Sequence, residues 1–82
     1  MIFLKVPLTV KTGIIVSLNE TYRRYRVALD IGGEAVFYST MFMSIPARFP
    51  RLGEKVAVTY TVSFDNLYKE EVLLVKALNR KR

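Results

Sequence analysis

Apolar and polar residues alternate with period two through most of the chain, which is typical of strands with one buried face. The longest alternation covers residues 8–18. Gly13, in its middle, predicts a bulge or bend. The side chains expected to face the core from this strand are Leu8, Val10, Thr12, Ile14, Val16 and Leu18.

A second strand is expected after turn residues at 19–21. Its alternation places four side chains inward and four outward: Tyr25, Val27, Leu29 and Ile31 inside, and Arg24, Arg26, Ala28 and Asp30 outside. Gly32-Gly33 then predicts a tight hairpin, because two glycines accept the positive φ that short turns require. A short third strand over 35–39 completes a meander.

The alternation stops over residues 40–54, where Pro46 and Pro50 prevent a long helix and leave room for a turn or two around 41–45. A fourth strand is expected over 55–64, with Tyr60 in phase with the core valines. A loop over 65–69 follows, then a nearly all-apolar last strand over 71–78 and a basic tail over 79–82.

Three strands in a meander, an irregular connector and a final hairpin predict an all-β fold, a small five-stranded barrel of the oligonucleotide-binding (OB) type. An SH3-like barrel has the same strand count with different connections, and periodicity does not separate the two. With 82 residues and neither an internal repeat nor a linker, the chain is expected to form a single domain over residues 1–82.

Composition narrows the function. The chain has no cysteine and no histidine, which removes disulfides, the commonest metal ligands and the commonest general base. Its acids form no cluster with metal-ligand spacing, so we expect neither an enzyme, nor a cofactor, nor a small-molecule substrate. There is no signal-peptide pattern and no apolar stretch of about 20 residues, so we expect a cytoplasmic protein with no membrane partner.

The net charge of +6 on so short a chain favours a polyanionic partner. Ligands of OB barrels lie across the second and third strands and against the adjoining loops. In this region cations and aromatic rings are interleaved, a mixture suited to phosphates and unpaired bases. The candidate nucleic-acid-binding residues are Lys11, Tyr22, Arg23, Arg24, Arg26, Phe37, Tyr38, Tyr68 and Lys69, with Phe64 beside them.

Some of these residues have an alternative role in the fold. Tyr25 and Tyr60 are in phase with valines and are expected in the core. Of Phe37 and Tyr38, one faces outward and the other inward, because neighbours on a strand point to opposite sides. Arg24 and Arg26 share one face and are the first choice for phosphate contacts.

Two resemblances add to this interpretation. Residues Pro50-Arg51-Leu52-Gly53-Glu54-Lys55-Val56-Ala57-Val58 are similar to the lead-in to the fourth strand of OB barrels, where a glycine precedes a charged residue and an alternating strand. The layout also resembles the small helix-destabilising proteins of filamentous phages. The segments that carry this likeness are Val10-Lys11-Thr12-Gly13, Tyr22-Arg23-Arg24 and Tyr60-Thr61-Val62-Ser63-Phe64.

The phage resemblance implies a homodimeric protein that binds single-stranded DNA during viral or mobile-element replication. We therefore expect non-catalytic binding of single-stranded nucleic acid, DNA or RNA, with little sequence preference. The alternative is a protein-interaction barrel, SH3-like or oligomerising, whose outer apolar residues bind a partner chain. Ile15, Leu73 and Val75 are the candidates for such contacts, being out of phase with the expected core.

Overall fold

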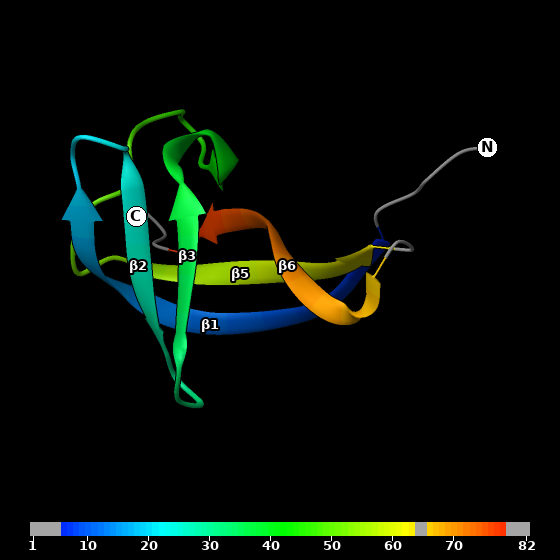
Figure 1. The fold of residues 1–82 in the computed structure, drawn as a ribbon. Helices are drawn as coiled ribbons and strands as arrows, with labels where there is room; N and C mark the ends of the chain where they lie inside the picture. The colour runs from blue at the N-terminus through cyan, green and yellow to red at the C-terminus, as the bar shows by residue number, and fades with distance from the viewer. Residues whose placement is uncertain (1–5, 64–65, 79–82) are drawn as a thin grey trace.

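The structure, a computed structural model, describes residues 6–63 and 66–78, and the side chains of 9–61 and 70–78. One six-stranded sheet curls into a half-barrel, so the small all-β barrel predicted from the sequence is confirmed (Figure 1). Its elements are β1 (Val6–Asn19), β2 (Arg24–Leu29), β3 (Glu34–Tyr38), the 3-10 helix η1 (Ser39–Met41), β4 (Phe42–Met43), β5 (Lys55–Ser63) and β6 (Asn66–Ala77).

The strand order is β3-β2-β1-β5-β6-β4. All neighbours are antiparallel except β4 and β6, which pair in parallel through Phe42 opposite Val75 and Met43 opposite Lys76. β3 and β4 are the two edge strands of this order, and η1 connects one directly to the other. A short stretch of chain therefore joins both edges of the sheet. This closure is compatible with the connectivity of an OB barrel.

The core lies on the concave side of the sheet, where β1, β2, β3, β5 and β6 all contribute buried side chains. Tyr25 stacks on Phe37 with ring centroids 5.1 Å apart, and Phe42 from β4 lies 6.3 Å beyond Phe37. Tyr25 and Tyr60 are buried, as predicted. Among the described side chains, the buried core cluster consists of Ile15, Tyr25, Val27, Ala35, Phe37, Val56, Val58, Tyr60 and Val75.

The direction predicted for the first half of β1 is wrong. Val10, Ile14 and Val16 are 61%, 40% and 47% exposed, whereas Ile15 is completely buried. Pairing with β2 shifts by one residue between Ile15 and Ser17, so the bulge lies at Val16 and not at Gly13. Beyond the bulge the predicted phase holds again, because Leu18 packs against the core opposite Tyr25.

Gly13 explains which face of β1 turns inward. A Cβ atom at this position would lie 2.5 Å from the carbonyl oxygen of Ala28 and 2.7 Å from Cγ1 of Val27. Only glycine fits between these atoms without movement of the β2 backbone. The close approach of β2 therefore needs Gly13, and Ile15 follows it on the same side.

We expect Gly13→Ala to lower the free energy of unfolding by about 1–3 kcal/mol, because the added methyl overpacks a contact with backbone. Urea unfolding measures the change, with Val10→Ala as the matched control at an exposed position of the same strand. Equal stability of Gly13→Ala and the wild type would contradict the close approach.

Three further sequence predictions need correction. Ile31 is exposed, because β2 ends at Leu29 and the hairpin closes with the Leu29 N–H donating to the Gly33 carbonyl at 3.0 Å. The loop predicted over 65–69 is strand from Asn66 onward. Where the sequence left room for a helical turn or two around 41–45, the structure has the single 3-10 turn η1, which begins two residues earlier at Ser39, followed by the two-residue strand β4.

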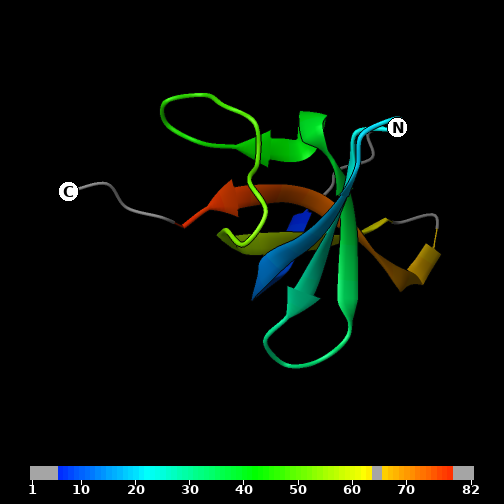
Figure 2. The same ribbon diagram turned by 90° about the vertical axis from the view of Figure 1, so that its left-hand side faces the viewer.

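Two of the three apolar residues proposed to contact a partner protein lie in the core, and the third is only partly exposed. Ile15 and Val75 are fully buried in the core, and Leu73 is half-buried. Exposed apolar side chains lie instead on the other face of β1 and in the connector over 44–54, which forms a long irregular loop (Figure 2). Within the described residues, no helix has the length and apolar character to span a bilayer.

Candidate nucleic-acid interface

Arg24 and Arg26 share the outer face of β2, as predicted, because Tyr25 and Val27 turn into the core between them. The register with β3 sets their neighbours. Arg24 lies directly opposite Tyr38, and Arg26 lies opposite Val36. Side chains on one face of directly opposed residues lie about 4.5–5.5 Å apart at Cβ, close enough to act together.

The turn before β2 adds an aromatic ring. The guanidinium carbon of Arg24 lies 5.9 Å from the ring centroid of Tyr22, within cation–π range. The turn is held by the Tyr22 N–H, which donates to Oδ1 of Asn19 at 3.3 Å. Tyr22 and Tyr38 are 65% and 49% exposed. We call this surface the β2–β3 face: Tyr22, Arg24, Arg26, Val36 and Tyr38.

A hollow of about 460 Å³ adjoins the β2–β3 face on the side of β1. Two guanidinium groups beside a hollow suit an anion such as a phosphate, since arginine offers a planar fork of donors. Two acids moderate the charge here: Glu20 lines the hollow, and Glu34 Oε1 lies 3.7 Å from Nε of Arg26. The lining residues are Ser17, Leu18, Asn19, Glu20, Arg24 and Arg26.

Phe37 does not belong to this surface, although the sequence made it a candidate. It is 1% exposed and lies between Tyr25 and Phe42 in the core. Because it alternates with Val36 and Tyr38, its burial is what turns those two side chains outward. Val36 was not a sequence candidate; its position opposite Arg26 is visible only once the β2–β3 register is known.

Lys11 lies apart from the β2–β3 face. It is in phase with Gly13 and Ile15 on the inner side of β1, and its Nζ atom lies 4.7 Å from the ring centroid of Tyr60. Nζ is also 3.8 Å from Oε1 of Glu70 on β6. Burial raises the pKa of the Tyr60 hydroxyl above its ordinary value, and the Glu70 carboxylate raises it further. Lys11 is thus paired within the sheet.

The remaining candidates are placed as follows. Arg23 ends the turn before β2, but its side chain contacts Phe49 of the connector and not the β2–β3 face. Tyr68 and Lys69 belong to β6, not to a loop, and their side chains lie outside the described residues, as does Phe64.

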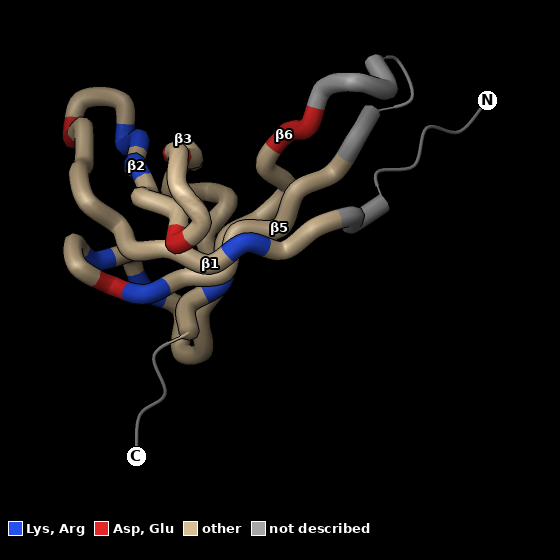
Figure 3. Tube along the Cα trace, turned by 90° about the horizontal axis from the view of Figure 1, so that it is seen from below, with Lys and Arg blue, Asp and Glu red and all other residues tan. Residues whose placement is uncertain are grey.

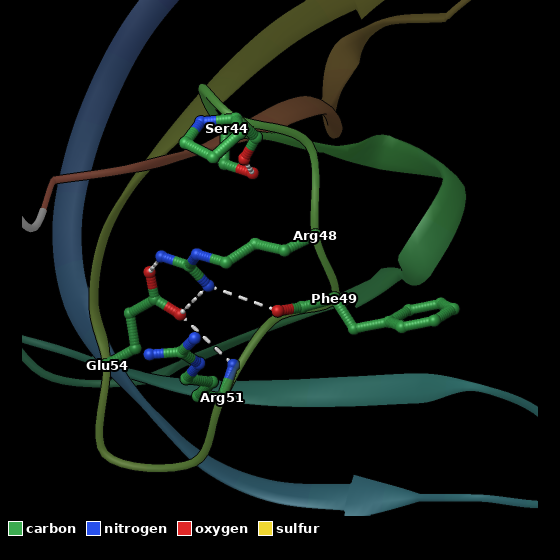
Figure 4. Close-up of polar contacts among 6 residues, drawn as sticks. Ser44, Arg48, Phe49, Arg51 and Glu54 are labelled. Atoms are coloured by element: carbon green, nitrogen blue, oxygen red, sulfur yellow. Dashed lines mark hydrogen bonds and ion pairs between the residues drawn. The ribbon is translucent and has the colours of Figure 1, made fainter.

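The connector carries an ion pair whose carboxylate, that of Glu54, is buried (Figure 4). Arg48 donates to both carboxylate oxygens of Glu54, with Nη1 3.0 Å from Oε1, and to the Phe49 carbonyl at 3.1 Å. The Arg51 backbone N–H donates to Oε1 of Glu54 at 3.0 Å. The hydrogen bonds from Arg48, opposed by burial, hold the pKa of Glu54 below its usual range. The charge of Arg48 is therefore neutralised within the fold.

Basic positions gather at the start of β2, and others lie around the connector and on β1 (Figure 3). Arg48 is paired with Glu54 and Lys11 with Glu70, whereas Arg24 of β2 lies beside the exposed ring of Tyr22 and Arg23 lies beside that of Phe49. In the part of the chain that the structure describes, no group of three acidic side chains is arranged to hold a metal ion. Comparison of the chain with family models, curated proteins and solved structures gives no match, so the functional argument depends on this geometry.

Proposed function

We propose that the protein binds single-stranded nucleic acid, DNA in preference, through the β2–β3 face and without catalysis. The observation that carries the proposal is the pairing of Arg24 with Tyr38 across two strands, with Tyr22 beside the same guanidinium. In this role a homodimer would coat single strands exposed during replication of a virus or mobile element.

The chemistry of the face favours single strands over duplex. An exposed ring on a sheet stacks with a base only when that base is unpaired and turned toward the protein, and each such stack contributes about 1–3 kcal/mol. Arg24 and Arg26 are two residues apart on one strand, so they track a backbone and do not fork around one base pair. We therefore expect low sequence preference and steep weakening with salt.

The test is fluorescence anisotropy of a labelled single-stranded oligonucleotide at low and high salt, with duplex DNA and RNA as competitors. We expect Arg24→Ala and Tyr38→Ala each to weaken binding about fivefold or more, the lower end of a base-stacking contribution. Arg24→Ala should also flatten the salt dependence by about one unit of slope.

Two exposed positions away from the face serve as matched controls. Lys76→Ala on β6 is the control for Arg24→Ala, because it removes the same unit of charge. Ile31→Ala is the control for Tyr38→Ala, because it removes an exposed side chain of similar apolar bulk. Absence of binding at low salt would overturn the proposal. Equal losses in Arg24→Ala and Lys76→Ala would show that net charge, and not this face, holds the ligand.

Glu34 gives a test in the opposite direction. Its carboxylate lies beside Arg26 and competes with a phosphate for that guanidinium. We expect Glu34→Gln to strengthen binding about two- to fivefold, the range of an exposed ion pair. Glu70→Gln, which changes the net charge equally but beside Lys11, is the control. Weaker binding in Glu34→Gln would contradict a phosphate at Arg26.

A second candidate function is a protein-interaction module. Its support is the exposed row of Val10, Ile14 and Val16 on β1, which lies on the outer side of the sheet. The same row serves a homodimer in the first proposal. Sedimentation equilibrium of Ile14→Lys measures whether this row joins copies of the chain, and retained oligonucleotide binding by that variant separates self-association from the β2–β3 face.

A further inference from the structure

A second hollow lies on the other side of the turn between β1 and β2. It measures about 290 Å³, just below the range of about 300–1,000 Å³ that is usual for small-ligand sites. Phe49 contributes to it from the connector and is 63% exposed. At this exposure most of the ring surface is open to a ligand. The hollow is lined by Leu18, Glu20, Arg23, Tyr25 and Phe49.

Consecutive arginines serve the two sides of this turn. Arg23 has a φ of 54°, a left-handed conformation that is rare for a residue with a side chain, and it reverses the chain before β2 begins. Its guanidinium carbon lies 5.7 Å from the Phe49 ring centroid, whereas that of Arg24 lies 5.9 Å from the Tyr22 ring centroid. Each side therefore holds one exposed ring with one arginine over it.

The two hollows are adjacent, because Leu18 and Glu20 line both. We infer that Phe49 and Arg23 form a second subsite for an unpaired nucleobase and its phosphate. A bound single strand then passes from the β2–β3 face around the turn to the connector. The inference rests on the proposed function, and it assigns a contact to a part of the chain that the sequence predicted only as a connector.

Glu20 gives the path a constraint. This residue lines both hollows and its negative charge repels phosphate, so the strand must present bases or sugars there, with its phosphates toward Arg23 and Arg24. A path of this kind needs a longer ligand than the β2–β3 face alone. Oligonucleotide length therefore separates the two sites.

The experiment measures affinity for oligothymidylates from about 4 to about 16 nucleotides, the span of site sizes of OB domains. We expect Phe49→Leu to bind the shortest ligands as the wild type does and the longest about fivefold or more weakly. Phe49→Tyr, which keeps a ring, restores the affinity. Leu52→Ala, at an exposed apolar position of the same connector, is the matched control.

A direct readout uses the wild-type protein. Oligonucleotides carrying one iododeoxyuridine are photocrosslinked at each position in turn, and the modified residue is identified by mass spectrometry. Crosslinks to Phe49 from one end of the ligand and to Tyr38 or Tyr22 from the other support the path.

Two results would overturn the inference. If Phe49→Leu and Leu52→Ala match the wild type at every length while Tyr38→Ala weakens binding, the second subsite is wrong and the proposed function stands. If the wild type binds no oligonucleotide at low salt, the proposed function fails and the subsite with it. Thermal unfolding of Phe49→Leu checks that a loss of affinity is not a loss of fold.

Discussion

Arg48→Met is expected to unfold at a much lower urea concentration than the wild type, with a loss of about 3–5 kcal/mol in the free energy of unfolding. The reason is Glu54, whose side chain is only 1% exposed and whose carboxylate is held by both terminal nitrogens of Arg48. Removing the guanidinium leaves a buried negative charge that keeps the hydrogen bond from the Arg51 N–H. The methionine keeps most of the apolar volume, so the loss reports the charge.

Two variants serve as controls for this ion pair. Glu54→Gln leaves Arg48, which is 24% exposed and reaches water, and should cost less, about 1–3 kcal/mol. The double variant Arg48→Met/Glu54→Leu removes both charges and should recover part of the loss of Arg48→Met, because an apolar pair of similar volume often replaces a buried ion pair. Stability of Arg48→Met within about 0.5 kcal/mol of the wild type, the usual range of a surface change, would contradict this account.

The same carboxylate sets the sign of a pH dependence. Hydrogen bonds from Arg48 lower the pKa of Glu54 from its ordinary value of 4.5, so the folded state binds this proton less readily than the unfolded state. Its contribution to stability is complete above 4.5 and is lost as the pH falls through the lower folded value. In Arg48→Met the hydrogen bonds that lower this pKa are missing, so acidification should reduce the difference in stability between the variant and the wild type. Urea unfolding midpoints of the wild type and Arg48→Met, measured at pH values above 4.5 and at lower pH, test this expectation.

The second large effect is expected at Phe37. Phe37→Ala should lower the free energy of unfolding by about 3–5 kcal/mol, because it deletes a buried ring at the centre of the Tyr25–Phe37–Phe42 stack. Tyr38→Ala, one residue along the same strand, should change it by no more than about 0.5 kcal/mol, since that ring is half exposed. Urea unfolding of the two variants compares neighbours on one strand.

For oligonucleotide binding we expect the opposite ranking of the two positions, with the larger loss at Tyr38 and the smaller at Phe37. Phe37→Leu keeps apolar volume in the core and is expected to bind as the wild type does once folded, whereas Tyr38→Ala weakens binding. If Phe37→Leu remained stable but lost affinity while Tyr38→Ala did not, the assignment of inner and outer faces on β3 would be wrong.

Much of the fold was predictable because alternation is a local signal. The β2 pattern, with arginines at every second position between apolar residues, fixes its faces without any knowledge of neighbours, and the structure agrees. In β1 the signal is ambiguous, because Ile14, Ile15 and Val16 are consecutive and either phase buries an apolar residue. The choice is made by Gly13, through its contact with the Ala28 carbonyl, which is a contact between strands.

The candidate site was predictable only in part, for a similar reason. Composition pointed to the cluster at 22–26, and alternation divided Phe37 from Tyr38 without saying which one faced out. Phe49 gave no signal in the sequence, because its place beside Arg23 depends on how the connector folds back on the barrel. Lys11 had the right charge, but Tyr60 and Glu70, both far along the chain, determine its surroundings.

The bulge at Val16 also bears on how the length of this chain can change during evolution. Deleting a residue where the pairing of β1 is regular would turn every side chain on one side of the gap to the opposite face of the sheet. Deleting Val16 would instead leave Ile15 opposite Val27 and Ser17 opposite Arg26, in regular alternation, at the expense of curvature. Relatives of this protein are therefore expected to gain or lose a residue here more readily than at the regularly paired positions of β1.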